Sequence, residues 1–247
     1  MIKKILVSQP RPQSDRNPYA DLTTRFGVDI DFYPLMAVEG LNSHDFRQQR
    51  INPLNYTAVL FNSRLAIDHF FRLAEEMRIT IPDTMHYYCI SEAVGNYLQK
   101  YIQYRKRKVF FSENNKFEDL LPAMNRRPTE KYMMVTSENH SDDVINMFAE
   151  HKITIQPAVM YRSVPVVWPK DKTFDYDLIV LFTPTGVEAI KQSFPKLSTK
   201  EVQFACFGTN TQAALRSLGI EPLIVAPTPS CPSITAAIAK YLEEQDA

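Results

Sequence analysis

Small polar residues follow the short apolar runs of this chain, and they are the residues best placed to do chemistry. They are Ser8, Asn62, Ser63, Ser91, Thr136, Ser137, Thr183, Thr185, Gly186, Gly208, Thr209 and Thr211. Hydroxyl and amide groups at the start of a helix accept hydrogen bonds from free backbone N–H groups, so these residues could simply cap helices. A helix start also carries a partial positive charge that attracts anions. The set therefore predicts helix capping, anion binding, or both.

The apolar runs alternate with amphipathic stretches. The runs cover residues 5–8, 58–61, 87–90, 109–111, 133–136, 178–182 and 204–207, which is typical of buried parallel strands. Three stretches are expected to be helices, namely residues 18–26, 141–150 and 209–218. Asn17 would cap the start of the first, and Gly219 would end the last. We expect each polar strand end to begin a helix. This alternation predicts an α/β fold with helices on both faces of a parallel sheet, where ligands bind at the carboxyl ends of the strands.

Three blocks of the chain recur in a second copy. Residues 5–8 and 28–30 resemble 133–136 and 153–155, residues 59–63 resemble 180–184, and residues 89–91 resemble 206–208. The blocks recur in one order at similar offsets, and each has a hydroxyl or amide side chain at the end of the strand. This pattern predicts two copies of one α/β unit.

Composition removes several classes of function. The formal net charge is zero, with 28 basic and 28 acidic residues, which argues against sequence-independent nucleic-acid binding. The six glycines form no dinucleotide-binding fingerprint, no phosphate-binding loop and no nucleophile elbow. The apolar run at residues 1–7 is too short for a signal peptide, and no run is long enough to span a membrane. We therefore expect a cytoplasmic protein with neither a nucleic-acid nor a membrane partner.

Other reactive residues are scattered. The five histidines supply no zinc-binding set, and the three cysteines have no C-x-x-C spacing. Cys89 and Cys206 occupy equivalent places in apolar runs, which predicts buried packing. The basic run at residues 105–108 is expected to be a solvated turn. We expect no metal and no cofactor.

Several motifs, taken in order, resemble those of the uroporphyrinogen-III synthase family. The strongest are residues 182–187 (FTPTGV), 205–215 (ACFGTNTQAAL) with Gly219 and Ile220, and 226–229 (APTP). Weaker matches are residues 61–63, 93–95, 117–121 and 159–162. Each motif is loose alone, but their order and spacing cover nearly the whole chain.

The resemblance implies an architecture. It predicts two flavodoxin-like α/β domains with parallel sheets, joined by a two-stranded extended linker. Residues 1–36 and 164–247 would form one domain and residues 40–160 the other, so that the first strand–helix–strand unit packs with the C-terminal half. The linker segments would be residues 36–40 and 160–165. A monomer is expected.

The resemblance also implies a reaction. The family closes the linear tetrapyrrole hydroxymethylbilane, with loss of water and inversion of the last ring through a spiro intermediate, to give uroporphyrinogen III. No metal or cofactor takes part. Tyr161 matches a family tyrosine and would hydrogen-bond the departing hydroxyl, since a phenol is a neutral donor at pH 7. Thr183, Thr185 and Thr211, with the backbone around Gly186 and Gly208, would hold carboxylates, and Asn62, Ser63 and Ser91 would do so in the other domain.

The chain departs from the family pattern in three places. Gln9 stands where the family often has an arginine, and residues 137–140 (SENH) replace a common arginine or glycine. A threonine expected after Gly95 is missing or shifted. These departures leave a second hypothesis open, a non-catalytic protein of the same fold that binds a tetrapyrrole or another polyanion. A third, a hydrolase or transferase, lacks an activated nucleophile.

Overall fold

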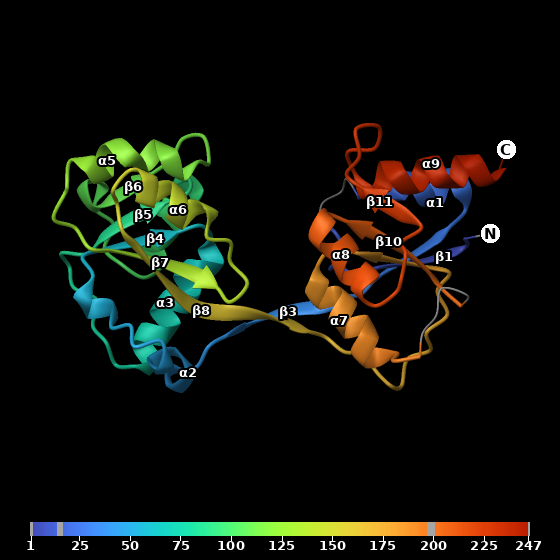
Figure 1. Ribbon diagram of the computed structural model, residues 1–247, viewed down its shortest axis with the longest axis horizontal. Helices are drawn as coiled ribbons and strands as arrows, with labels where there is room; N and C mark the ends of the chain where they lie inside the picture. The colour runs from blue at the N-terminus through green and yellow to red at the C-terminus, as the bar shows by residue number, and fades with distance from the viewer. Residues whose placement is uncertain (1, 14–16, 197–200, 247) are drawn as a thin grey trace. The chain divides into compact units, whose positions relative to one another are not determined.

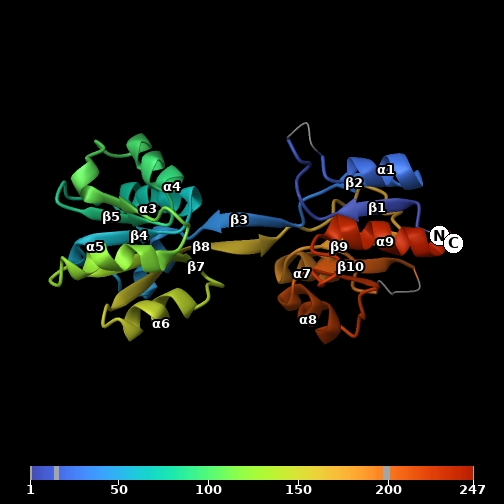
Figure 2. The same ribbon diagram turned by 90° about the horizontal axis from the view of Figure 1, so that it is seen from above.

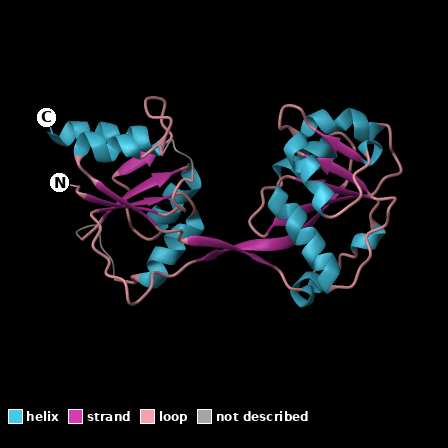
Figure 3. Ribbon diagram, turned by 180° about the vertical axis from the view of Figure 1, so that it is seen from behind, coloured by secondary structure: helices cyan, strands magenta, loops and turns pink. Residues whose placement is uncertain are grey.

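The computed structural model describes residues 2–13, 17–196 and 201–246, apart from the side chain of Asp246. Contacts divide the chain into two units. The terminal unit comprises Met1–Ala37 and Val164–Ala247, and the central unit comprises Val38–Ser163. Each unit is a sheet of parallel strands, with one antiparallel edge strand in the central unit, and helices cover both faces (Figure 3). The predicted α/β class with two parallel sheets is confirmed.

The terminal unit has a five-stranded sheet in the order β11-β10-β9-β1-β2 (Figure 1). Its elements are β1 (Lys4–Val7), α1 (Ala20–Phe26), β2 (Asp29–Phe32), β9 (Leu178–Leu181), α7 (Pro184–Ser193), β10 (Gln203–Phe207), α8 (Thr209–Ser217), β11 (Ile224–Ala226) and α9 (Ile234–Asp246). Helices α1 and α9 pack on one face, around Val7 and Val180. Helices α7 and α8 pack on the other, around Leu181 and Phe204. Figure 2 shows α1 and α8 on opposite sides of this sheet.

The central unit has a six-stranded sheet in the order β3-β8-β7-β4-β5-β6. Its elements are β3 (Met36–Gly40), α2 (Ser43–Gln48), β4 (Ala58–Phe61), α3 (Arg64–Glu76), β5 (His86–Cys89), α4 (Glu92–Tyr97), β6 (Val109–Phe111), α5 (Leu121–Asn125), β7 (Tyr132–Ser137), α6 (Asp143–Glu150) and β8 (Ile155–Pro165), with short 3₁₀ turns between them. Helices α3 and α4 cover the face that carries Val59 and Phe61. Helices α5 and α6 cover the face that carries Leu60 and Met134.

Strands β3 and β8 carry the chain between the two units. They are neighbours in the sheet, and backbone bonds join Leu41 to Met160 and Val166 to Leu35. These bonds show that the two strands run in opposite directions. They form the two-stranded extended linker that the family resemblance predicts.

Five strands have the same spatial order in the two units, but the chain enters that order at a different strand in each unit. Strands β11, β10, β9, β1 and β2 of the terminal unit correspond to β6, β5, β4, β7 and β8 of the central unit. The predicted repeat pairs β1 with β7, β9 with β4 and β10 with β5, and strand order confirms it. Helix α9 contacts α1, where Arg25 pairs with Glu243. In chain order the terminal unit runs from β1 and β2 to β9, β10 and β11, whereas the central unit runs from β4, β5 and β6 to β7 and β8. The units are therefore related by circular permutation.

The expectation that every polar strand end begins a helix is wrong at two places. Ser8 is followed by a loop, because Pro10 and Pro12 lack backbone donors and restrict the residues before them; α1 begins only at Ala20, not at residue 18. Thr136 and Ser137 are followed by a continued pairing with β8, in which the Glu138 N–H bonds the carbonyl of Tyr161 at 3.0 Å.

Candidate active site

The central sheet reverses its winding between β4 and β7. Helix α3 leaves β4 toward one face, and α6 leaves β7 toward the other. In open α/β sheets, ligands bind at the carboxyl ends of the strands beside such a switch point. Here those ends carry Asn62 and Ser63 after β4 and Ser137 at the end of β7. Three predicted residues thus lie at the place where topology favours a ligand.

Tyr161 lies beside this switch point, on β8. Its residue exposure is 8%, so the ring is largely buried. Burial raises the pKa of the Tyr161 phenol above its ordinary value of 10.0, while the nearby polar side chains of Ser63 and Asn62 act in the opposite direction. At pH 7 the phenol is therefore neutral and can donate a hydrogen bond.

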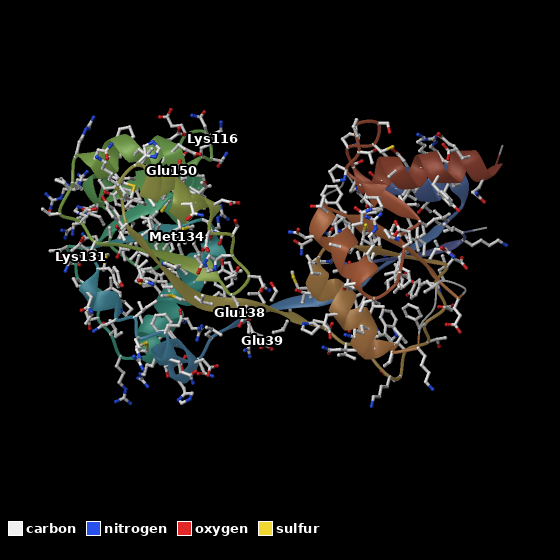
Figure 4. The ribbon with its side chains drawn as sticks, viewed as in Figure 1. Glu39, Lys116, Lys131, Met134, Glu138 and Glu150 are labelled. Atoms are coloured by element: carbon white, nitrogen blue, oxygen red, sulfur yellow. The ribbon has the colours of Figure 1, made fainter. Side chains whose placement is uncertain are left out.

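A β-bulge and one glutamine fix the backbone around Tyr161. The register of β7 and β8 shifts between Thr136 and Ser137, so that Ser137 pairs with Tyr161. Glu138, labelled at the end of β7 in Figure 4, bonds the Tyr161 carbonyl. The Gln49 side chain donates to the carbonyl of Val159 at 2.7 Å and accepts from its N–H at 2.9 Å. These bonds hold β8 on both sides of the residue before Tyr161.

The ring of Tyr161 stacks on His69. The two ring centroids are 5.1 Å apart and the planes differ by 18°. His69 lies on α3, less than two turns after Ser63, and is half-buried. Burial and the nearby Arg72 lower the pKa of His69 below 6.5, against the pull of Asp68. The imidazole is therefore neutral at pH 7.

The serines at the helix starts of the central unit cap their helices. Ser63 accepts from the N–H of Ala66 at 3.1 Å, and Ser91 accepts from the N–H of Val94 at 3.4 Å. Ser63 also contacts Tyr161. Ser63 thus both caps its helix and contacts Tyr161, whereas the contact described for Ser91 is the helix cap.

The terminal unit carries a second group of predicted residues at its own switch point, between β1 and β9. Thr183 caps α7 by accepting from the N–H of Gly186 at 3.1 Å. A Cβ built on Gly186 would lie 3.5 Å from the Thr183 hydroxyl and 3.9 Å from the Ser8 hydroxyl. Thr185 lies in the first turn of α7. Ser8, Thr183 and Gly186 therefore come together, and they surround backbone N–H groups at the start of a helix.

The remaining predicted residues differ in exposure. Gly208 precedes α8 with φ of 89°, in the region that favours glycine, and Thr209 is exposed in the first turn of that helix. Thr211 and Thr136 are 2% and 1% exposed. The Thr136 hydroxyl is buried without a hydrogen-bond partner in the described part of the chain. Thr136 and Thr211 lie beneath the surface, so any direct contact with a ligand stays a prediction.

The two equivalent cysteines are poorly suited to act as nucleophiles. Burial raises the pKa of the Cys89 thiol to about 12 and that of Cys206 to about 11, so neither is a thiolate at pH 7. Within residues 2–13, 17–196 and 201–246, no group of three histidine, cysteine, aspartate or glutamate residues is placed to hold a metal ion. No helix described in the structure combines the length and apolar character needed to cross a membrane.

Sequence reasoning missed three residues that support Tyr161, namely Gln49, His69 and Arg72. His69 is one of the five scattered histidines, and Gln49 carries no motif. Gln49 is 110 residues away from its partner Val159. No local spacing links such residues, and only the chain fold brings them together.

Comparison with known proteins gives a consistent result. The family model for "Uroporphyrinogen-III synthase HemD" matches residues 17–236. Among solved structures, a uroporphyrinogen-III synthetase from Helicobacter pylori 26695 is 15% identical to this chain, with a TM-score of 0.56. The match covers 98% of this chain and 100% of the Helicobacter chain. A mutant uroporphyrinogen III synthase from the extremely thermophilic bacterium Thermus thermophilus is also 15% identical over 98% of this chain and 99% of its own, with a TM-score of 0.47. A search of curated protein sequences gave no significant match.

Proposed function

Because this chain belongs to the uroporphyrinogen-III synthase family of haem-biosynthesis enzymes, we propose that it closes hydroxymethylbilane to uroporphyrinogen III with inversion of the last ring. The observation that carries the residue assignment is the place of Tyr161 at a topological switch point, with its largely buried phenol close to the side chains of Asn62 and Ser63. The reaction is a dehydration followed by ring closure, which makes the enzyme a lyase.

Tyr161 is the hydrogen-bond donor to the departing hydroxyl. The bond between the hydroxymethyl carbon and its oxygen breaks with its electron pair going to the oxygen, which takes up one proton and leaves as water. A positioned acid that assists such a step contributes typically ~10²- to 10⁴-fold. The electron-poor carbon that remains is attacked by the last pyrrole ring, and the spiro intermediate rearranges and closes with loss of a proton. Asn62 and Ser63 support the phenol by contacting its hydroxyl.

The polar residues at the strand ends hold the acetate and propionate groups of the substrate. In the central unit these are Asn62, Ser63, Ser91 and Ser137, with Thr136 beneath them. In the terminal unit they are Ser8, Thr183, Thr185, Gly186, Gly208 and Thr209, with Thr211 beneath them. Free N–H groups at the starts of α3, α4, α7 and α8 suit carboxylates even though the chain has no net charge. Such binding orients a flexible chain, and orientation decides which isomer forms.

Three further assignments complete the proposal. The protein works in the cytoplasm, and it acts as a monomer. Neither a metal nor a cofactor takes part.

A coupled assay tests the proposal. Hydroxymethylbilane would be generated in place, incubated with the protein, oxidised and separated into isomers I and III by chromatography. We expect isomer III to dominate. Isomer I at the spontaneous rate would reject the synthase and favour the alternative, a tetrapyrrole-binding protein of the same fold, for which titration with uroporphyrinogen would then measure affinity.

A further inference from the structure

We propose that His69 is a positioning residue, whose neutral imidazole ring holds the Tyr161 phenol in place against Asn62 and Ser63. This inference rests on the proposed role of Tyr161. The backbone of Tyr161 is fixed by Glu138 and Gln49, but backbone contacts leave the side-chain torsions free. The stacked ring of His69, 5.1 Å away, limits the movement of the phenol. A reactive group needs this kind of support, because small displacements cost activity.

His69 is itself held by Arg72. The Arg72 Nε donates toward His69 Nδ1 at 3.4 Å. The guanidinium is anchored in turn, because it donates to the Leu41 carbonyl at 2.5 Å and to Glu76 at 2.9 Å. The position of the imidazole therefore depends on a chain of contacts that begins at the end of strand β3.

Gly40 leaves room for this arrangement. A Cβ at position 40 would lie 2.7 Å from His69 Nδ1 and 2.6 Å from an Arg72 nitrogen, which is closer than real Cβ contacts allow. The glycine lets the end of β3 approach both side chains. As a result, the strand that enters the central unit packs against the residue that supports Tyr161.

The arrangement requires His69 to be neutral. Nδ1 faces the Arg72 N–H, so it must carry a lone pair, and the ring proton must lie on Nε2. Within the described chain, the charged and titratable groups that act on His69 are Arg72 and Asp68 of its own helix and Tyr161 of β8, and Gly40 of β3 lies against its ring. Protonation would place two cations side by side and release the contact with Arg72. The contact with Arg72 that anchors the ring is thus formed above the pKa of His69 and lost below it.

Kinetics of His69→Ala and His69→Phe test the inference. We expect His69→Ala to lower kcat about 10-fold with little change in KM, since a misplaced reactive group costs up to ~10²-fold in rate. His69→Phe keeps a flat ring and should recover most of kcat. Wild-type kcat should fall as pH drops through the pKa of His69, and this acid limb should be absent in His69→Phe. His44→Ala, on the exposed surface of α2, should match the wild type.

A double variant separates positioning from an independent effect. In a Tyr161→Phe background, His69→Ala should cause no further loss of kcat, because the group that it positions is already gone. An unchanged kcat in His69→Ala, a multiplicative loss in the double variant, or an acid limb that persists in His69→Phe would each overturn the inference.

A spectroscopic measurement keeps the inference testable if the synthase reaction fails. 3-Fluorotyrosine placed at position 161 would report the ring environment by its ¹⁹F chemical shift. We expect the shift to titrate near the pKa of His69 in the wild type but not in His69→Phe, and to change in His69→Ala. If the ¹⁹F chemical shift and its pH dependence were the same in the wild type and in both variants, positioning by His69 would be rejected. Isomer I formed by the wild type would instead reject the proposed function, whatever the shift.

Discussion

The side-chain amide of Gln49 makes two hydrogen bonds with the backbone of Val159, from which it is separated by 110 residues in the chain. The amide bonds the N–H and the carbonyl of the same residue, as a neighbouring strand would. Strand β3 ends at Gly40, after which the Leu41 N–H bonds the Met160 carbonyl, and Gln49 continues the pairing of β8 from there. Two residues further along β8 is Tyr161, so the amide fixes the strand that presents the phenol.

Gln49→Leu should destabilise the protein. The substitution removes both partners of the Val159 backbone groups, and partly buried groups left without hydrogen bonds cost about 1–3 kcal/mol. Urea unfolding would measure the difference. Gln48→Leu is the matched control, because the Gln48 side chain contacts the exposed His44 instead of the backbone of β8. Equal losses in the two variants would contradict the structural role of Gln49.

Tyr161→Phe should lower turnover more than substrate binding. The variant keeps the ring that stacks on His69 and loses only the hydroxyl that contacts Ser63 and Asn62. We expect kcat to fall about 10²-fold, the lower part of the range for a lost proton donor, with KM changed less than about 3-fold. Steady-state kinetics with isomer analysis would measure both. A variant as fast as the wild type would remove Tyr161 from the mechanism.

Thr183→Asp should separate capping from anion binding. Aspartate is also a good N-cap, so the stability of the protein should change by no more than about 0.5 kcal/mol. Its negative charge would lie beside Gly186 and Ser8, where a substrate carboxylate is proposed to bind. Repulsion of about 1 kcal/mol or more should raise KM at least about 5-fold.

Thr183→Ala is the complementary control for that experiment. It loses the cap, at a cost of about 1 kcal/mol, but adds no charge. We expect its stability to fall while its KM changes less than that of Thr183→Asp. An unchanged KM in Thr183→Asp would leave Thr183 with capping alone.

Stability should fall with rising pH above 10, partly because of Tyr19. Burial raises the pKa of Tyr19 from 10.0 to about 12 in the folded protein. The unfolded chain therefore loses this proton first, and the stability that Tyr19 contributes is complete below pH 10 and lost as pH approaches 12. In Tyr19→Phe, the decline of unfolding free energy should be shallower by up to about 1.4 kcal/mol per pH unit. Urea unfolding at about pH 8 and pH 11, on either side of the ordinary phenol pKa, would test this, and parallel declines in both proteins would contradict it.

The local elements, and the edge of each sheet that carries polar groups, could be predicted from the order of amino acids alone. Apolar runs marked the strands from 58–61 to 204–207, because a strand buried on both faces must be apolar throughout. The repeat of polar residues at strand ends identified Ser63 and Thr183 as helix starts, since capping uses residues close together in the chain. Even the equivalence of β1 with β7 and of β9 with β4 could be read from the recurring blocks.

The assembly of these pieces into a site depended on long-range packing. The β-bulge at Thr136 and Ser137 sets the register that brings Tyr161 to its place, and a bulge leaves no reliable mark in the local pattern. Gln49 and His69 reach β8 from segments far away in the sequence, through contacts whose geometry depends on chain packing. Periodicity reports which face of an element is buried, because burial repeats with the turn of the helix or strand. It carries no information on which distant side chain packs against that face, and that choice is made only when the sheet is assembled.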